Sequence, residues 1–282
     1  MKKIFEIIGL GTLICFSFFY TEKVGYVVKE LDNLMIEIKD KSQKYELQPI
    51  NAKIINNTII PGIYGKKIDI NESYKKMKRI NEYNDNLLVY ESVKPEISIE
   101  KIYDKYVIGG NKNLKQVSII IIVKDNTDIN YIRNLAISKN VKFNFFINGS
   151  WLEDNNDFLI ELIKEGHNIG NLSYNSDYSN SYFIWMDTIL KKIVKQKRNY
   201  CYLETEKEEY LKICALNKNY TIKPSIVIKS NPTLHIQKSI ENGSIISLEA
   251  SNNNVDELQI AINYIINRGY KVVSLNELLS EK

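Results

Sequence analysis

The chain has 282 residues, of which 44% are hydrophobic and 26% charged, so it can bury a full hydrophobic core. Its formal net charge is only +4 and its basic residues form no long run, which argues against nucleic-acid binding. With two histidines, three cysteines and no Cys-x-x-Cys pair, the sequence does not predict a His/Cys zinc site.

The N-terminus has the pattern of a membrane-targeting segment. Lys2 and Lys3 precede an apolar run over residues 4–20, and no Ala-x-Ala-like cleavage site follows. We therefore predict an uncleaved signal anchor over residues 1–21, which crosses the membrane once and leaves the C-terminal domain outside the cytoplasm. Cleavage of the segment and secretion of the protein is the alternative.

Two segments separate this anchor from the main domain. Residues 22–45 read as a helical stalk, because apolar residues recur at intervals of three and four: Val27, Val28, Leu31, Leu34 and Ile38. Residues 46–112 read as a small α+β module with short strands, turns and one helix. We find no chemistry in this module and expect it to dock on the core domain or on a partner.

The main domain, residues 113–282, alternates strands with helices. We expect strands at 117–123, 141–147, 200–203, 225–229, 244–248 and 270–273. We expect helices at 128–138, 155–165, 181–196, 206–216, 232–241, 255–267 and 275–279. This alternation predicts an α/β fold with a parallel sheet. The number of units suits a closed or nearly closed barrel, with an open doubly wound sheet as the alternative.

The three cysteines do not indicate a disulfide framework. Cys15 lies in the N-terminal apolar run, and two remaining cysteines could pair with each other but form no larger pattern. We therefore expect Cys201 and Cys214 to be free, partly buried thiols.

One motif points to a known family. Residues 165–176 read Glu-Gly-His-Asn-Ile-Gly-Asn-Leu-Ser-Tyr-Asn-Ser. This segment resembles the Glu-Gly-His-Glu-Ile-Gly-Asn-His-Ser/Thr-x-x-His motif of the polysaccharide deacetylases, the NodB-homology family. Residues 140–149, 243–248 and 269–279 resemble further motifs of that family in the same order. The resemblance covers residue 116 to the C-terminus and implies a distorted (β/α) barrel of the NodB type.

The residues that carry the family's chemistry differ in this chain. Leu172 and Ser176 stand where the family has its metal-binding histidines. Lys124 stands where the family has its general base, and Asp125 keeps the position of a metal-binding aspartate. Glu249, or Leu248 in a shifted register, takes the place of the late catalytic histidine.

The family's arginine segment corresponds to residues 202–204, which contain no arginine. The resemblance therefore implies a protein without a metal or other cofactor, in which the standard deacetylase mechanism is lost. Whether any enzymatic activity remains is left open.

Some residues are candidates for a remaining function. The weak catalytic candidates are Asp125, Glu249 and His167, although a lone histidine is more often structural, as we expect for His167 and His235. The glycan-binding candidates are Tyr174, Tyr178 and Tyr182, because aromatic faces suit sugar stacking. We place Phe183 and Trp185 in the core. We expect solvated surface charges at Asp154, Asp157, Asp177, Glu204 and Glu249.

The sequence thus favours a catalytically inactive envelope protein that binds cell-wall glycan or a partner protein. The first alternative is an active hydrolase that removes acetyl groups from a wall polysaccharide through a rearranged site at Asp125, Glu249 or His167. The second is a protein-interaction role of residues 22–112, for which the barrel serves as a platform.

Overall fold

The computed structural model describes residues 11–17, 20, 24, 29–124, 128–175, 177–250 and 255–282. The chain divides into two compact units. The N-terminal unit comprises residues 1–49 and 64–94, and the core unit comprises residues 50–63 and 95–282. The segment 46–112, which we expected to be one module, is therefore shared between the two units.

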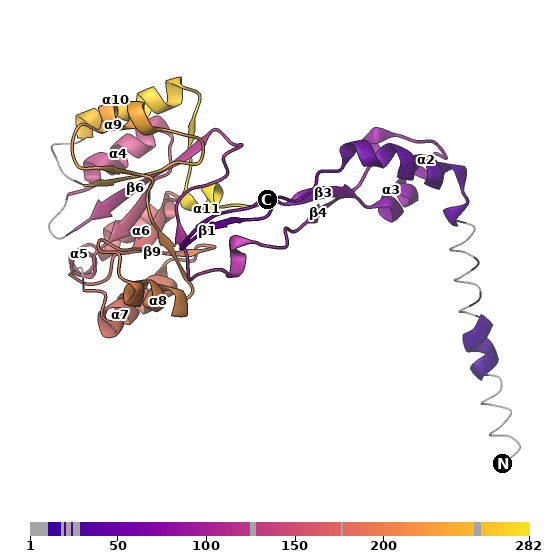
Figure 1. Cartoon of the computed structure of the whole chain (residues 1–282), viewed down its shortest axis with the longest axis horizontal. Coiled ribbons are helices and arrows are strands. Elements are labelled where there is room, and N and C mark those ends of the chain that lie inside the picture. Colours follow the sequence, from indigo (N-terminus) through magenta and orange to yellow (C-terminus); the bar gives the residue numbers. More distant parts are fainter. Residues whose placement is uncertain are drawn as a thin grey trace, which may run out of the picture. The chain divides into compact units, whose positions relative to one another are not determined.

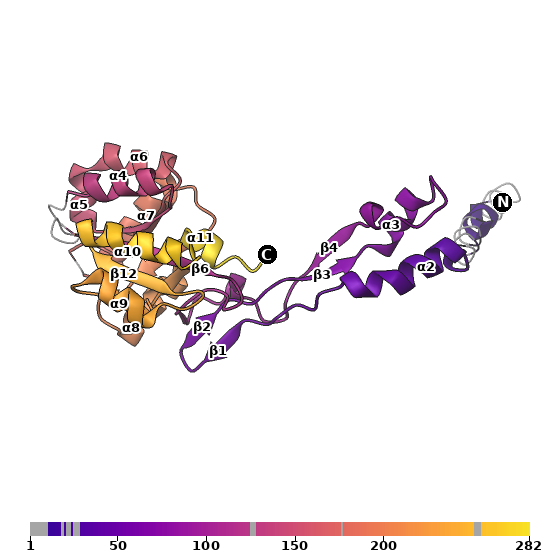
Figure 2. The ribbon, with the colours of Figure 1, turned by 90° about the horizontal axis from the view of Figure 1, so that it is seen from above.

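The N-terminal unit combines helices with a two-stranded antiparallel sheet. It contains α2 (Asn33–Ser42), η1 (Gln43–Tyr45), β3 (Gly65–Ile68), α3 (Ile70–Met77), η2 (Asp85–Leu87) and β4 (Tyr90–Val93). Figure 2 shows α2 beside α3, and β3 pairs antiparallel with β4. Two residues of the predicted stalk stripe, Leu34 and Ile38, pack in this unit's apolar cluster, which also includes Met77. Leu31, a third residue of the stripe, is exposed, and Val27 and Val28 lie outside the described residues.

The predicted membrane anchor, residues 1–21, falls largely on residues that the structure does not describe, namely 1–10, 18, 19 and 21. No helix in the described part of the chain combines the length and the apolar character that a membrane crossing needs.

The core unit is built on an 11-stranded sheet. The strands are β1 (Lys53–Ile55), β2 (Thr58–Ile60), β5 (Tyr106–Val107), β6 (Gln116–Val123), β7 (Asn144–Ile147), β8 (Asn168–Asn171), β9 (Asn199–Tyr202), β10 (Asn219–Ile222), β11 (Ile226–Ile228), β12 (Ile245–Glu249) and β13 (Lys271–Val272). Their order is β1-β2-β5-β10-β9-β8-β7-β6-β12-β11, and β13 pairs with β6. The described strands β1 and β11 form its two ends, so the sheet is a half-barrel and not the closed barrel that the number of units suggested.

Helices cover the sheet. They are α4 (Asn130–Lys139), α5 (Gly149–Asp154), α6 (Asn156–Lys164), α7 (Asn180–Ile193), α8 (Glu208–Leu216), α9 (Pro232–Ser239), α10 (Val255–Asn267) and α11 (Leu275–Leu278), with η3 (Ile99–Lys101) before β5. Helices α4, α9 and α10 lie side by side (Figure 1). Strand β6 is apolar from Ile119 to Val123 because both its faces are buried there: Ile119 and Ile121 join the cluster under the outer helices, whereas Ile120 joins the cluster that includes Leu275 of α11.

The C-terminal tail fixes the segments that precede β6. The Glu281 side chain is buried and accepts hydrogen bonds from the backbone N–H groups of Gly62 at 2.7 Å and Ile99 at 3.0 Å, and from the hydroxyl of Ser98. These bonds satisfy a carboxylate that would otherwise be costly to bury. Residues 50–63 and 95–101 therefore belong with the core unit, which local sequence patterns could not show.

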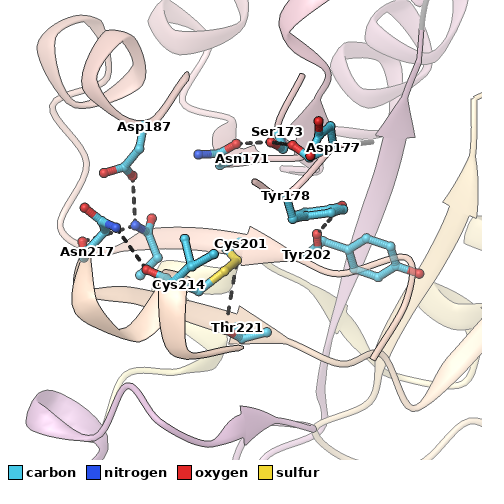
Figure 3. Close-up of a disulfide and its surroundings, with 12 residues drawn as sticks. Asn171, Ser173, Asp177, Tyr178, Asp187, Cys201, Tyr202, Cys214, Asn217 and Thr221 are labelled. Carbon is cyan, nitrogen blue, oxygen red and sulfur yellow. Dashed lines mark hydrogen bonds between the residues drawn. A yellow bond between two sulfur atoms is a disulfide. The ribbon is translucent and has the colours of Figure 1, made fainter. Parts of the chain in front are cut away.

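The cysteine prediction was wrong. Cys201 in β9 and Cys214 in α8 form a disulfide, with their Cα atoms 6.4 Å apart (Figure 3). Both residues are buried. The crossover from β9 through α8 to β10 brings the helix back against the strand that precedes it, and this places the two cysteines within bonding reach.

Candidate functional site

Three charged residues meet at the carboxyl edge of the sheet. Lys124 directly follows β6, Glu204 follows β9 and Glu249 ends β12. In the sheet order, β7 and β8 separate β6 from β9, so the ends of these two strands would lie roughly 14 Å apart in a flat sheet. The curvature of the half-barrel closes this gap, because Lys124 contacts both carboxylates.

The contact is an ion-pair triad with the lysine at its centre. The Lys124 Nζ lies 2.8 Å from Glu204 Oε1 and 3.3 Å from Glu249 Oε2. The hydrogen bond to the Glu204 carboxylate raises the pKa of Lys124 above its ordinary value. The lysine therefore stays an ammonium ion and cannot serve as a general base near neutral pH. Glu204 and Glu249 are paired, which corrects our prediction that they are merely solvated surface charges.

A cavity of about 370 Å³ adjoins the triad. Its lining combines carboxylates and hydroxyl groups with apolar side chains: Ile122, Tyr202, Glu204, Val227, Ile228, Lys229, Ser247, Leu248 and Glu249. Burial raises the pKa of the Tyr202 phenol, which therefore remains a neutral hydrogen-bonding group. The cavity can accommodate a sugar-sized group and offers it polar contacts.

The two positions aligned with the family's metal histidines were Leu172 and Ser176. Leu172 is fully buried among apolar residues, including Phe146 and Tyr200. Ser176 lies outside the described residues, as does Asp125. An apolar side chain at one ligand position and an ammonium ion at Lys124 do not fit a divalent cation. Within the described residues no group of three or more His, Cys, Asp or Glu side chains could hold a metal ion.

The backbone turn of the motif is nevertheless formed. Ser173 is buried with a positive φ of 64°, a conformation that a serine adopts only when its surroundings hold it. Its N–H donates to Asn171 Oδ1 at 2.7 Å, and its hydroxyl donates to the Asp177 carbonyl oxygen (Figure 3). The side chains of Asn171 and Ser173 thus hold the turn that follows β8.

His167 has a structural position. It precedes β8 at the amino edge of the sheet, so the length of a strand separates it from Glu249. Its Nδ1 accepts the N–H of Phe143 at 3.1 Å, and its ring packs edge-on against Phe145. His235, the other histidine, lies exposed on α9.

His167 makes the stability of the protein pH-dependent. Burial lowers the pKa of His167 to about 4, whereas the same group in the unfolded chain titrates near 6.5. Between these values the unfolded chain binds more protons, so stability falls as the pH falls. We expect a loss of roughly 2 kcal/mol from pH 7 to pH 5. Urea unfolding of His167→Gln should lack this part of the acid loss, while the exposed control His235→Gln should retain it. An equal acid loss in all three proteins would contradict the prediction.

An exposed aromatic patch lies after β8. It consists of Tyr174, Tyr182 and Trp185, and the last two are 47% and 40% exposed. Tyr174 stacks on Tyr182 with ring centroids 5.6 Å apart, and meets Trp185 edge-on at 5.5 Å. Gly149 makes room for the patch, because a Cβ at that position would overlap the ring of Tyr174. These rings offer a rigid apolar surface to a ligand.

Two aromatic predictions change here. Tyr178, a predicted glycan contact, is buried, and its hydroxyl donates to the carbonyl oxygen of Tyr202 at 2.7 Å (Figure 3). Trp185, which we placed in the core, is exposed, whereas Phe183 is fully buried as expected. The helical spacing explains the difference, since Phe183 and Trp185 are two residues apart in α7 and point to different faces.

Sequence reasoning missed the role of Glu204. Two exchanged positions could have indicated this role. Residues 202–204 align with the family's arginine segment but include Glu204, and Lys124 stands where the family has an acidic base. Two opposite exchanges of charge indicate an ion pair in a shared site. In the structure Lys124 pairs with Glu204.

Comparisons with known proteins agree with this fold. No family model matches the chain. It is 27% identical to the uncharacterized protein YlxY of Bacillus subtilis over 274 residues, which cover 90% of this chain and 86% of YlxY.

Solved structures extend the comparison. BA3943, described as a CE4 family pseudoenzyme from Bacillus anthracis, matches with a TM-score of 0.68 and 24% identity over 89% of this chain and 96% of its own. A BA3943 mutant described as having restored enzymatic activity matches with the same TM-score and 23% identity, over 89% of this chain and 99% of its own. The family 4 carbohydrate esterase PdaA of B. subtilis matches with a TM-score of 0.55 and 20% identity, over 82% of this chain and 97% of its own.

Proposed function

Because the chain resembles a degenerate member of the polysaccharide deacetylase family, we propose that it is a catalytically inactive, glycan-binding protein of the cell envelope. The family's fold is retained, and with it a cavity and an aromatic patch at one edge of the sheet. Other residues stand at the positions of the family's base and of its two metal-binding histidines, whereas Asp125 keeps the position of a metal-binding aspartate.

The proposed loss of activity rests on one observation above all. Lys124, at the position of the family's base, is held as an ammonium ion between Glu204 and Glu249. A deacetylase needs a basic group and an electrophile at this place. The buried Leu172 removes a metal ligand as well. Hydrolysis through His167 together with Glu249 has no support in the geometry, since the two residues lie at opposite edges of the sheet.

The similar solved structures support the proposal that the chain keeps the fold and has lost the activity. BA3943 is described as a pseudoenzyme, and its mutant as having regained activity. A fold that keeps its scaffold after losing its chemistry is thus found in a protein that matches nearly the whole length of this chain. We extend that interpretation to this chain as a proposal.

The disulfide supports a place outside the cytoplasm. Disulfides persist in oxidising compartments and are rare where thiols are kept reduced. The pair Cys201–Cys214 therefore suits a domain exposed at the cell envelope, held by the predicted anchor over residues 4–20 or released after cleavage. The partner that we propose is a cell-wall glycan, reached at the outer surface of the membrane.

Glycan binding should depend on the aromatic patch. We expect Tyr182→Ala and Trp185→Ala each to weaken binding of partially N-acetylated glucosamine oligosaccharides by about tenfold, because each removes an exposed ring on which a sugar face can stack. Calorimetry on the full chain measures the affinity. Tyr131→Ala, which removes a similarly exposed tyrosine from α4, is the matched control and should bind as the unaltered chain does. Unchanged affinity in both patch variants, or no binding at all, would refute the proposal.

A further inference from the structure

We propose that the carboxyl edge of the sheet selects glycans whose amino groups are free, and that Glu204 and Glu249 bind the sugar's ammonium group. This inference rests on the proposed function and adds the chemical class of the ligand. Glycan strands from which acetyl groups have already been removed would be bound in preference to fully N-acetylated ones.

The two carboxylates that line the cavity already bind one primary ammonium group, that of Lys124, which is not itself part of the lining. The Lys124 Nζ sits between the two carboxylates at 2.8 and 3.3 Å, which is the geometry of charge-assisted hydrogen bonds to an amine. A glucosamine residue carries the same ammonium group on a sugar ring. The site is therefore built from groups that recognise an amine, whereas an acetamido group brings no charge to these carboxylates.

Glu249 is the carboxylate available to a ligand. Its side chain is 58% exposed, against 25% for Glu204, and it forms the longer of the two contacts with Lys124. Among the described residues only the Oε2 of Glu249 is paired, so its other oxygen has no partner there. Lys229 also lines the cavity from an exposed position. The two carboxylates thus face two lysines, and a bound ammonium group would compete with Lys124 for Glu249.

The aromatic patch has acidic neighbours too. Glu153 Oε2 accepts the hydroxyl of Tyr174 at 3.0 Å, and the exposed Asp177 is bridged to Tyr174 through the backbone. Carboxylates beside the stacking surface favour a cationic sugar and disfavour an anionic polymer. The patch and the cavity belong to the same edge of the sheet, because Tyr174 follows the carboxyl end of β8, and Glu204 and Glu249 lie at the carboxyl ends of β9 and β12.

The test compares two oligosaccharides of equal length, one of N-acetylglucosamine and one of glucosamine, by calorimetry with the full chain at low salt. We expect the glucosamine oligosaccharide to bind about tenfold more tightly. The double variant Glu204→Gln and Glu249→Gln should lose this preference, because its affinity for the glucosamine oligosaccharide should fall to its affinity for the acetylated one. Glu241→Gln, which alters an exposed glutamate ahead of the amino end of β12, should keep the preference.

The outcomes separate this inference from the proposed function. Equal affinity for the two oligosaccharides would overturn the selection of free amino groups and leave glycan binding in place. A preference that survives the double variant would also overturn the inference, because the cavity carboxylates would not be its source. Absence of binding to both oligosaccharides would overturn the proposed function itself.

Discussion

A chain that carries Lys124→Asp, Leu172→His and Ser176→His is expected to bind one zinc ion per molecule, whereas we expect none to bind to the unaltered chain. With Asp125, the two introduced imidazoles complete a set of one carboxylate and two histidines, which is enough for a zinc site that keeps an open position. Lys124→Asp also removes an ammonium ion that repels a divalent cation.

The triple variant should also be more stable with bound zinc than without it. Leu172 is fully buried among apolar side chains, so an imidazole there without a metal is expected to cost roughly 3 kcal/mol. Saturating zinc at about 100 times its dissociation constant should return about 2.7 kcal/mol. Thermal unfolding with and without zinc measures this. The matched control omits Ser176→His, and it should bind zinc much more weakly. A triple variant that folds but whose thermal unfolding does not change with zinc would show that this chain is wrongly aligned with the family's metal-binding positions.

Replacing Cys201 and Cys214 by serine is expected to lower the free energy of unfolding by about 3 kcal/mol, the value for a cross-link that closes a loop of this size. The disulfide spans 13 residues and ties β9, the strand before Glu204, to α8. Denaturant unfolding of the double variant measures the loss. Cys15→Ser changes a free, exposed cysteine and should leave stability unchanged. If reduction of the unaltered chain and the serine variants both leave the transition unmoved, the disulfide does not contribute as we expect.

The sequence predicted the scaffold of the core unit well, because buried parallel strands leave a local signal. The apolar run of β6 and the strand at 244–248 were recognised from their composition. Strands β8 and β10 were missed as strands. They are short and carry buried asparagines, such as Asn168 and Asn219, whose side chains form hydrogen bonds with partners that are distant in the sequence.

The site was predictable only in part. The alignment identified Lys124 and Glu249 as exchanged positions, but the two residues are 125 positions apart, and only the curvature of the sheet brings them into contact. Local spacing likewise could not show that α8 returns to β9 and places Cys214 beside Cys201. Asp125 and Ser176, two positions on which the family's chemistry depends, lie outside the described residues, so their roles stay predictions.

The central claim is that this fold has kept its scaffold and lost its metal-dependent chemistry. The most direct test is to measure the zinc content of the purified full chain, its zinc affinity by calorimetry and its release of acetate from N-acetylglucosamine oligosaccharides. The account predicts sub-stoichiometric zinc, no heat of binding and no acetate. One tightly bound zinc ion per chain, together with acetate release that a chelator abolishes, would contradict it.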